Sequence, residues 1–163
     1  MIPIQNIYYM LSYAFQILNE QGYRNIATEQ FNNTAELMAA ILEKGIANQL
    51  KRGLCKEYIP QTEALSSLRG KIDIAESIKT QSMLLICTYD EFSVNSTMNQ
   101  IIKSTVELLL CSNISKKRKK NLRKLMIYFG EVDFIDLHTV NWNVQYNRNN
   151  QTYRMLISIC YLV

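Results

Sequence analysis

Histidine, glycine and proline are scarce in this chain of 163 residues, and their scarcity limits its chemistry. The single histidine, His138, cannot form a two-histidine metal pair, so we interpret it as a loop residue rather than a catalytic base. The five glycines are scattered, and neither GxxxxGK[ST] nor GxGxxG occurs, which excludes the usual phosphate-binding loops. We therefore expect that the chain on its own neither binds nor hydrolyses a nucleotide.

A nuclease signature is missing too. Metal-dependent nucleases hold Mg²⁺ with carboxylates beside a lysine, and their usual local signature is an acidic residue, any residue and then Lys. None of the fourteen Asp and Glu residues has Lys two positions later. The pairs Asp90–Glu91 and Asp133–Asp136 could meet a metal, but surface solvation and capping explain them better. We predict no catalytic residue and no metal site.

Cysteines are few and far apart, and long apolar runs are absent. The cysteines at 55, 87, 111 and 160 form no zinc knuckle or CxxC motif, so we expect reduced thiols. No segment approaches about 18 uninterrupted apolar residues, and the first residues lack the basic region of a secretory signal. The sequence therefore favours a cytoplasmic protein without a membrane partner.

The residues that are present suit one folded domain. Hydrophobic residues make up 48% of the chain, which is enough for a core. Apolar residues recur at helical spacing in several segments, although Gly45 weakens the second of them. We predict helices over residues 4–20 (ended by Gly22), 33–50, 97–110 (capped by Asn95-Ser96), 115–128 and from 152 onward.

Alternating patterns predict strands between the second and third helices. Residues 55–74 hold two strands, and Pro60 places the first at a sheet edge. Residues 83–89 form a third, residues 90–95 a loop, and residues 130–150 an irregular connection. The fold class is thus α+β, with helices packed on a small, mostly antiparallel sheet and a projecting basic turn.

The last predicted helix ends in an apolar CYLV without Gly, basic residues or a polar tail. Helix carbonyls at such an end normally find partners. We expect that the surface packing on it lies in a segment outside this chain. The alternative is a short helix whose end packs inside the domain.

A run of cations between residues 116 and 124 is the most pronounced electrostatic feature. DNA phosphate or an acidic protein surface would relieve their mutual repulsion on a helix. The run therefore predicts non-specific DNA binding, with a solvated helix face as the alternative. The residues concerned are Lys116, Lys117, Arg118, Lys119, Lys120, Arg123 and Lys124.

A second group of cations consists of Lys51, Arg52, Arg69 and Lys71. Both arginines precede a glycine near a predicted turn, where a guanidinium can be presented to another protein. An arginine offered to a partner's nucleotide site can stabilise transition-state charge. The alternative is that these are ordinary exposed cations of strands and turns.

Several segments, taken in chain order, resemble the McrC family. The opening IPIQNIYYMLSYA at residues 2–14 resembles the start of McrC. Lys44-Gly45, RGL at 52–54 and LRGKID at 68–73 resemble the family's basic turn and the strand after it. YDEFS at 89–93 with Asn95, NQIIKST at 99–105 and YRMLISIC at 153–160 resemble the loop and helices that follow. The likeness covers nearly the whole chain, and the ordered set is more specific than any single piece.

The resemblance implies a division of labour. McrC-like proteins serve restriction systems that act on 5-methylcytosine DNA. Their N-terminal half docks on the AAA+ GTPase McrB and stimulates GTP hydrolysis, and a C-terminal PD-(D/E)xK domain cuts DNA. This chain resembles only the first half. We therefore expect a partner-binding domain over residues 1–163 without its own nuclease, and GTP and Mg²⁺ used by the partner alone. The residues expected to contact the partner and stimulate its GTP hydrolysis are Lys51, Arg52, Arg69 and Lys71.

Overall fold

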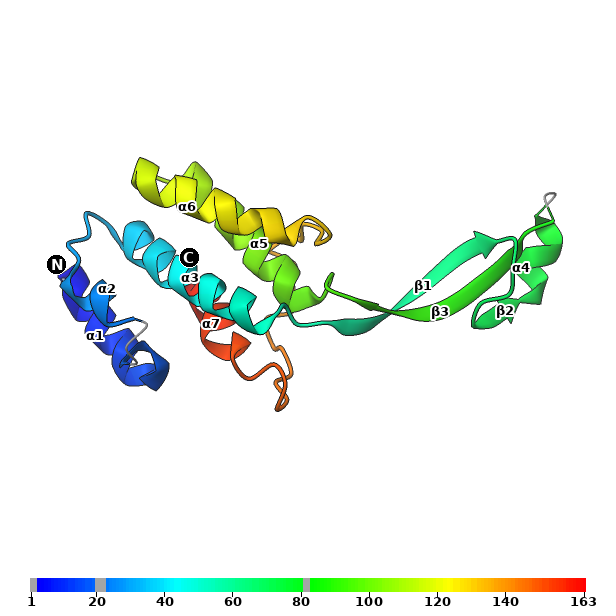
Figure 1. Cartoon of the computed structure of the whole chain (residues 1–163), viewed down its shortest axis with the longest axis horizontal. Helices are drawn as coiled ribbons and strands as arrows, with labels where there is room; N and C mark the ends of the chain where they lie inside the picture. Colours follow the sequence, from blue (N-terminus) through cyan, green and yellow to red (C-terminus); the bar gives the residue numbers. More distant parts are fainter. Residues whose placement is uncertain (1–2, 20–22, 81–82) are drawn as a thin grey trace. The chain divides into compact units, whose positions relative to one another are not determined.

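The computed structural model describes residues 3–19, 23–80 and 83–163. The chain divides into two compact units (Figure 1). The helical unit takes in Met1–Cys55 and Thr97–Val163, and the sheet unit takes in Lys56–Ser96. Helices and an antiparallel sheet in one chain confirm the predicted α+β class.

The helical unit is arranged around one long helix, α3. This helix contacts α1, α5, α6 and α7. Its buried face supplies Leu37, Ile41, Leu42 and Ile46, each at most 1% exposed, so α3 forms the centre of the core. The helices of this unit are α1 (Ile4–Ala14), α2 (Arg24–Thr28), α3 (Thr34–Arg52), α5 (Thr97–Cys111), α6 (Lys116–Met126) and α7 (Tyr153–Leu162), with 3₁₀ turns η1 (Gln16–Asn19) and η2 (Ile127–Phe129).

Local chemistry sets the limits of α3. The Asn33 side chain accepts a hydrogen bond from the Glu36 backbone N–H at 2.7 Å, which caps the first turn. At the other end Gly53 has φ +94°, a conformation that other residues rarely adopt. A Cβ at Gly45, inside the helix, would overlap the Leu156 side chain of α7. The glycine that weakens the helix pattern therefore allows two helices to pack closely.

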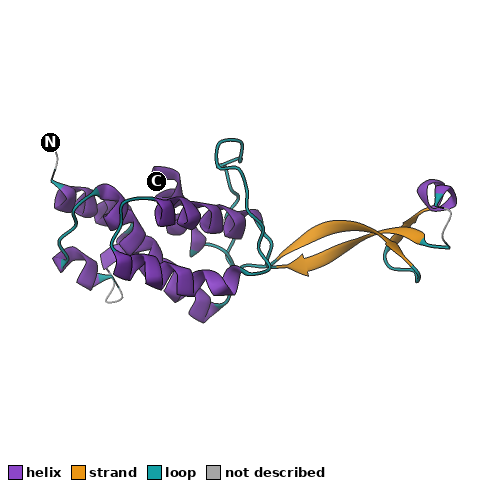
Figure 2. Ribbon diagram, turned by 90° about the horizontal axis from the view of Figure 1, so that it is seen from above, coloured by secondary structure: helices purple, strands orange, loops and turns teal. Residues whose placement is uncertain are grey.

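The sheet unit consists of β1 (Glu57–Leu65), β2 (Lys71–Asp73), α4 (Ile74–Lys79) and β3 (Leu85–Ser93). Its strands form an antiparallel sheet in the order β1-β3-β2 (Figure 2). The β1–β3 register runs from Glu57 opposite Ser93 to Leu65 opposite Leu85. Pro60 lies in β1, which is an edge strand as predicted.

One local prediction in the sheet unit is wrong. Residues 90–93 belong to β3 rather than to a loop, because β1 pairs with them along its whole length. The tilted rings of Tyr58 and Phe92, with centroids 4.9 Å apart, strengthen the pairing where β1 begins and β3 ends. The second predicted strand is confirmed as the short β2, and α4 after it was not predicted. The Asp73 side chain accepts from the Glu76 N–H at 3.0 Å and caps this helix.

The predicted helices of the other unit occur with altered ends. The first helix stops at Ala14 and continues as η1, and the short α2 was not predicted. Gly22, the predicted stop, lies outside the described residues. The basic helix begins at its Ser115 cap as predicted, and residues 130–150 contain no regular element. No helix within the described ranges combines the length and apolarity needed to cross a bilayer.

Candidate functional site

The four cations predicted to contact a partner lie at two places. Lys51 and Arg52 occupy the last turn of α3, where positive charge complements the helix dipole. Arg69 immediately precedes Gly70 in the β1–β2 connection, and Lys71 begins β2. All four side chains are exposed. Within the described ranges none of them has a carboxylate at ion-pair distance.

Arg69 differs from the other three because an aromatic ring holds it. Its guanidinium carbon lies 3.8 Å from the ring centroid of Tyr89 on β3, which is close stacking. The Tyr89 hydroxyl donates to Glu63 Oε2 on β1 at 3.0 Å. Partial desolvation, followed by this hydrogen bond, raises the pKa of Tyr89 above 10.0, so the phenol remains a donor near neutral pH.

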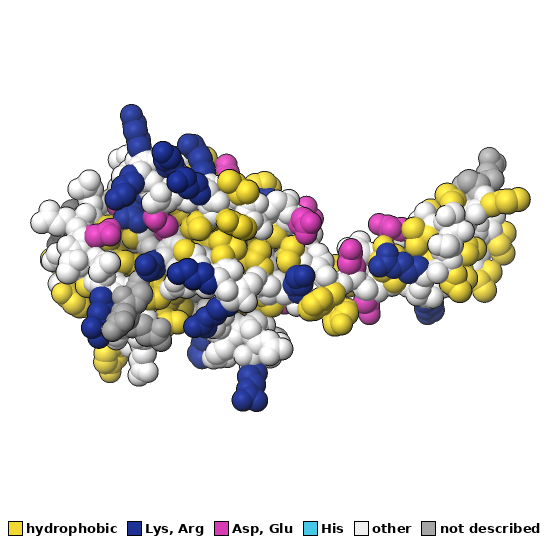
Figure 3. Space-filling model, in the orientation of Figure 1, with side chains coloured by type: hydrophobic (Ala, Val, Ile, Leu, Met, Phe, Trp, Pro, Cys, Tyr) yellow, Lys and Arg dark blue, Asp and Glu magenta, His cyan; other side chains and the backbone are white. Residues whose placement is uncertain are grey.

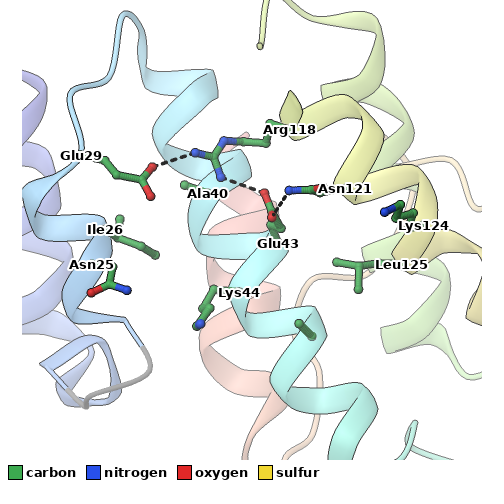
Figure 4. Close-up of a pocket in the computed structure, with 11 residues that line it drawn as sticks. Asn25, Ile26, Glu29, Ala40, Glu43, Lys44, Arg118, Asn121, Lys124 and Leu125 are labelled. Carbon is green, nitrogen blue, oxygen red and sulfur yellow. Dashed lines mark hydrogen bonds and ion pairs between the residues drawn. The ribbon is translucent and has the colours of Figure 1, made fainter. Parts of the chain in front are cut away.

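The basic helix α6 uses one of its cations internally. The Arg118 guanidinium contacts Glu29 at 2.9 Å, Glu36 at 2.9 Å and Glu43 at 2.8 Å. The Glu43 carboxylate also accepts from the Asn121 side chain at 2.8 Å. Figure 4 shows Arg118 and Asn121 reaching from α6 toward Glu29 and Glu43 at a cavity of about 420 Å³. These four polar side chains satisfy one another and form a structural joint between α6 and the segments that carry Glu29 and Glu43.

Glu36 is the most enclosed carboxylate of this joint, with its side chain 11% exposed. It accepts from the Ser115 N–H at 2.7 Å, from Ser115 Oγ at 2.8 Å and from Arg118. Burial alone would raise the pKa of Glu36. The hydrogen bonds from Ser115 and Arg118 outweigh it and lower the pKa below 4.5. The same cluster raises the pKa of Arg118.

The remaining cations of α6 face outward. Leu122 is fully buried on the inner side of the helix. In the part of the chain that the structure describes, the outer cations have no ion pair. Figure 3 shows Lys and Arg side chains gathered over α6. Lys119 is half-buried. The exposed cations of α6 are Lys116, Lys117, Lys120, Arg123 and Lys124.

The groups that could carry catalysis are scattered or inert. Burial raises the pKa of the Cys160 thiol to about 12, so it is a poor nucleophile. His138 is exposed, and the side chain of Asp136 accepts from its backbone N–H at 2.9 Å. Asp90 and Glu91 are successive strand residues on opposite faces of β3. Among the described residues no group of three or more His, Cys, Asp or Glu could hold a metal ion.

Sequence reasoning missed Tyr89, Glu63 and the glutamates around Arg118. Their roles depend on contacts between residues far apart in the chain, such as Arg118 with Glu29, 89 positions away. One signal was available for Arg118. It lies on the same side of the helix as Leu122, four residues later, and therefore points toward the core.

The chain matches the family model of the "McrBC 5-methylcytosine restriction system component" over residues 5–163. It is 31% identical over 170 aligned residues to the "Type IV methyl-directed restriction enzyme EcoKMcrBC" of Escherichia coli K12, covering 98% of this chain and 47% of that relative. The chain thus spans about half the length of this relative.

Solved structures show the same fold. A chain of the Thermococcus gammatolerans McrBC complex superposes with a TM-score of 0.71 and 23% identity, covering 99% of this chain and 51% of that one. A second chain from the same organism belongs to an assembly of McrB AAA+ hexamers with bound McrC. It superposes with a TM-score of 0.69 and 21% identity, covering 92% of this chain and 40% of that one. The resemblance to McrC seen in the sequence is confirmed, and the chain belongs to the family of McrBC 5-methylcytosine restriction system components.

Proposed function

We propose that this chain is the partner-docking part of an McrC-like subunit, which binds an McrB-like AAA+ GTPase and stimulates its GTP hydrolysis. The family match over residues 5–163 carries this proposal. The fold similarity to a chain in an assembly of McrB hexamers with bound McrC supports it. In this proposal the partner uses GTP and Mg²⁺, and DNA cleavage belongs to a nuclease domain separate from these residues.

The exposed cations at the end of α3 and around β2 are the proposed contacts. Lys51, Arg52, Arg69 and Lys71 have no carboxylate partner within the described ranges, so their charge is available to an anionic surface. A guanidinium near a nucleotide can neutralise charge that develops during phosphoryl transfer. Arg52 and Arg69 are therefore the residues proposed to stimulate hydrolysis, while Lys51 and Lys71 contribute to docking.

GTP turnover by the cognate GTPase, measured with and without this chain, tests the proposal. We expect stimulation by the wild-type chain and its loss by at least tenfold with Arg52→Ala or Arg69→Ala, since an arginine that stabilises the transition state of phosphoryl transfer is worth about 10³- to 10⁵-fold in kcat. Arg148→Ala, at an exposed arginine in the irregular segment, is the matched control and should stimulate normally. Failure of the wild-type chain to stimulate would remove the proposal.

A second candidate function is non-specific DNA binding by α6. Its support is the outward cations that lack described ion pairs, while Arg118 is committed to glutamates and does not contribute. Binding through about five phosphate contacts would weaken roughly 10²- to 10³-fold between 50 and 200 mM salt. Titrating a DNA duplex at both salt concentrations tests this. Replacing Lys116, Lys117, Lys120 and Lys124 by Gln should reduce the loss of affinity over this salt range to about three- to fourfold, as expected for one remaining contact.

A further inference from the structure

The structure uses two arginines in opposite ways. The three guanidinium nitrogens of Arg118 form ion pairs with three glutamates, and its side chain is only 16% exposed. Arg69 is exposed, and within the described residues no hydrogen bond or ion pair occupies its nitrogens. Its guanidinium carbon lies over the face of the Tyr89 ring, 3.8 Å from the ring centroid. Stacking restrains the guanidinium plane and leaves the N–H groups, which point outward in that plane, free.

The ring that carries Arg69 is itself fixed. Tyr89 belongs to β3, the central strand of the sheet, and lies opposite Gln61 of β1. Glu63 lies diagonally opposite, on the same face as Tyr89, and accepts the phenol hydrogen bond. A half-buried ring on a central strand with a bonded hydroxyl has little rotational freedom. The Tyr89 ring therefore offers the Arg69 guanidinium an aromatic surface in a fixed position.

Gly70 brings the backbone next to Arg69 close to this ring. Its φ of +66° lies in the region that favours glycine, and a Cβ there would overlap the Thr88 carbonyl oxygen and come within 2.8 Å of Tyr89 Cβ. The chain can therefore approach β3 closely enough for Arg69 to lie over the ring. The contact thus depends on one backbone geometry and one aromatic side chain.

We propose that Tyr89 is a positioning residue, which holds the Arg69 guanidinium pre-oriented to clamp an oxyanion of the GTPase partner. This inference rests on the proposed function above. A guanidinium binds carboxylate or phosphate through two parallel N–H donors, and a fixed plane favours that geometry. Ordering a free arginine on binding would weaken the interaction by roughly two- to tenfold, and the ring removes this cost in advance.

A double-mutant cycle on the complete chain tests the inference. The variants are Arg69→Ala, Tyr89→Leu and both together, and the readout is the chain concentration that gives half-maximal GTPase stimulation. We expect Tyr89→Leu to raise this concentration about two- to tenfold and to have no further effect once Arg69 is absent. Tyr89→Phe keeps the ring face and should retain most of the wild-type behaviour. Tyr128→Leu, at an exposed tyrosine of the helical unit, is the control and should leave the Arg69 coupling unchanged.

A measurement without the partner separates this inference from the proposed function. The ring current of Tyr89 should shift the Arg69 side-chain proton resonances upfield in the isolated chain, and Tyr89→Leu should abolish the shift while Tyr89→Phe keeps it. If Arg69→Ala impairs stimulation but Tyr89→Leu does not, the positioning role is wrong and the proposed function stands. If the wild-type chain fails to stimulate, the proposed function fails, and the role toward that partner fails with it.

The nature of the oxyanion follows from repeating the cycle as binding titrations. If Arg69 and Tyr89 are coupled in binding to both the nucleotide-free and the GTP-analogue-bound partner, the oxyanion that Arg69 binds is a protein carboxylate. If they are coupled only in binding to the nucleotide-bound partner, the oxyanion is a nucleotide phosphate. Absence of coupling in both states would overturn the inference.

Discussion

At the scale of single residues, Arg118 determines how α6 is held. Its guanidinium meets Glu36 and Glu43 of α3, and Glu29, which follows α2. Partly buried carboxylates lose hydration on folding, so they need this partner more than exposed ones do. A cation-rich helix is therefore anchored by the one guanidinium that faces inward, together with the buried Leu122.

Replacing Arg118 by Ala should lower the free energy of unfolding by about 2–4 kcal/mol, because Glu36 and Glu43 would remain desolvated without their cation. Arg123→Ala, at an exposed cation of the same helix, should change it by no more than about 0.5 kcal/mol. Urea unfolding monitored by circular dichroism measures both. Equal effects of the two substitutions would contradict the structural role of Arg118.

Glu36 also predicts how stability depends on pH. Because its pKa in the folded state is lowered from 4.5, its contribution is fully present above the unfolded pKa and is lost as the pH falls through the folded value. We expect the free energy of unfolding to decline below about pH 4.5, and to decline less steeply in Glu36→Gln. Urea titrations between pH 3 and pH 7 measure this slope, with the exposed Glu107→Gln as control.

At the scale of helices, a small hydrogen-bond cluster joins the end of α3 to α5 and α7. The Tyr153 hydroxyl donates to Asn99 Oδ1 at 2.8 Å and accepts from the Cys55 N–H at 2.7 Å. The Asn99 amide donates to the Cys55 carbonyl at 2.9 Å. Both backbone groups of Cys55, the last residue of this part of the helical unit, are thus bonded by side chains of two other helices.

Removing the hydroxyl in Tyr153→Phe should lower the free energy of unfolding by about 1–3 kcal/mol, because Cys55 and Asn99 each lose a partner at a fully buried ring. Tyr13, whose side chain is 92% exposed, offers the same chemical change as a control, and Tyr13→Phe should be nearly neutral. Chemical denaturation compares them. A neutral Tyr153→Phe would show that the cluster does not stabilise the unit.

At the scale of the whole molecule, the buried apolar side chains are distributed unevenly. The helical unit contains almost all of them, and in the described part of the sheet unit only Cys87 is a buried hydrophobic residue. The sheet unit therefore depends on its strand hydrogen bonds and on cross-strand pairs such as Tyr58 with Phe92. Small sheets of this kind have marginal stability of their own.

Hydrogen exchange should reveal this difference. Amides of β1 and β3 should exchange at least tenfold faster than those in the middle of α3 and α5, because opening the sheet unit exposes little apolar surface. Mass spectrometry of peptides covering residues 57–65 and 85–93, compared with those covering residues 37–46 and 101–109, measures it. Equal protection in both units would contradict a less stable sheet unit.

Local sequence patterns were enough to predict α3, α5, α6 and α7, and Pro60 predicted the edge position of β1. These elements depend on short-range spacing, caps such as Asn33 and Ser115, and the exclusion of Pro60 from a central strand. The ordered motifs also identified the family. The sequence thus determined the α+β class, the family and the locations of the main cations.

Only the tertiary structure decided what those cations do. Arg118 and Arg123 look alike in the basic run, yet one is enclosed by glutamates from distant segments and the other faces outward. Arg69 became distinct from Lys71 once strand pairing brought Tyr89 beneath it. The extension of β3 to Ser93 likewise needed its partner β1. The physical reason is common to all three: ion pairs, stacking and strand ladders form between residues that chain proximity does not bring together.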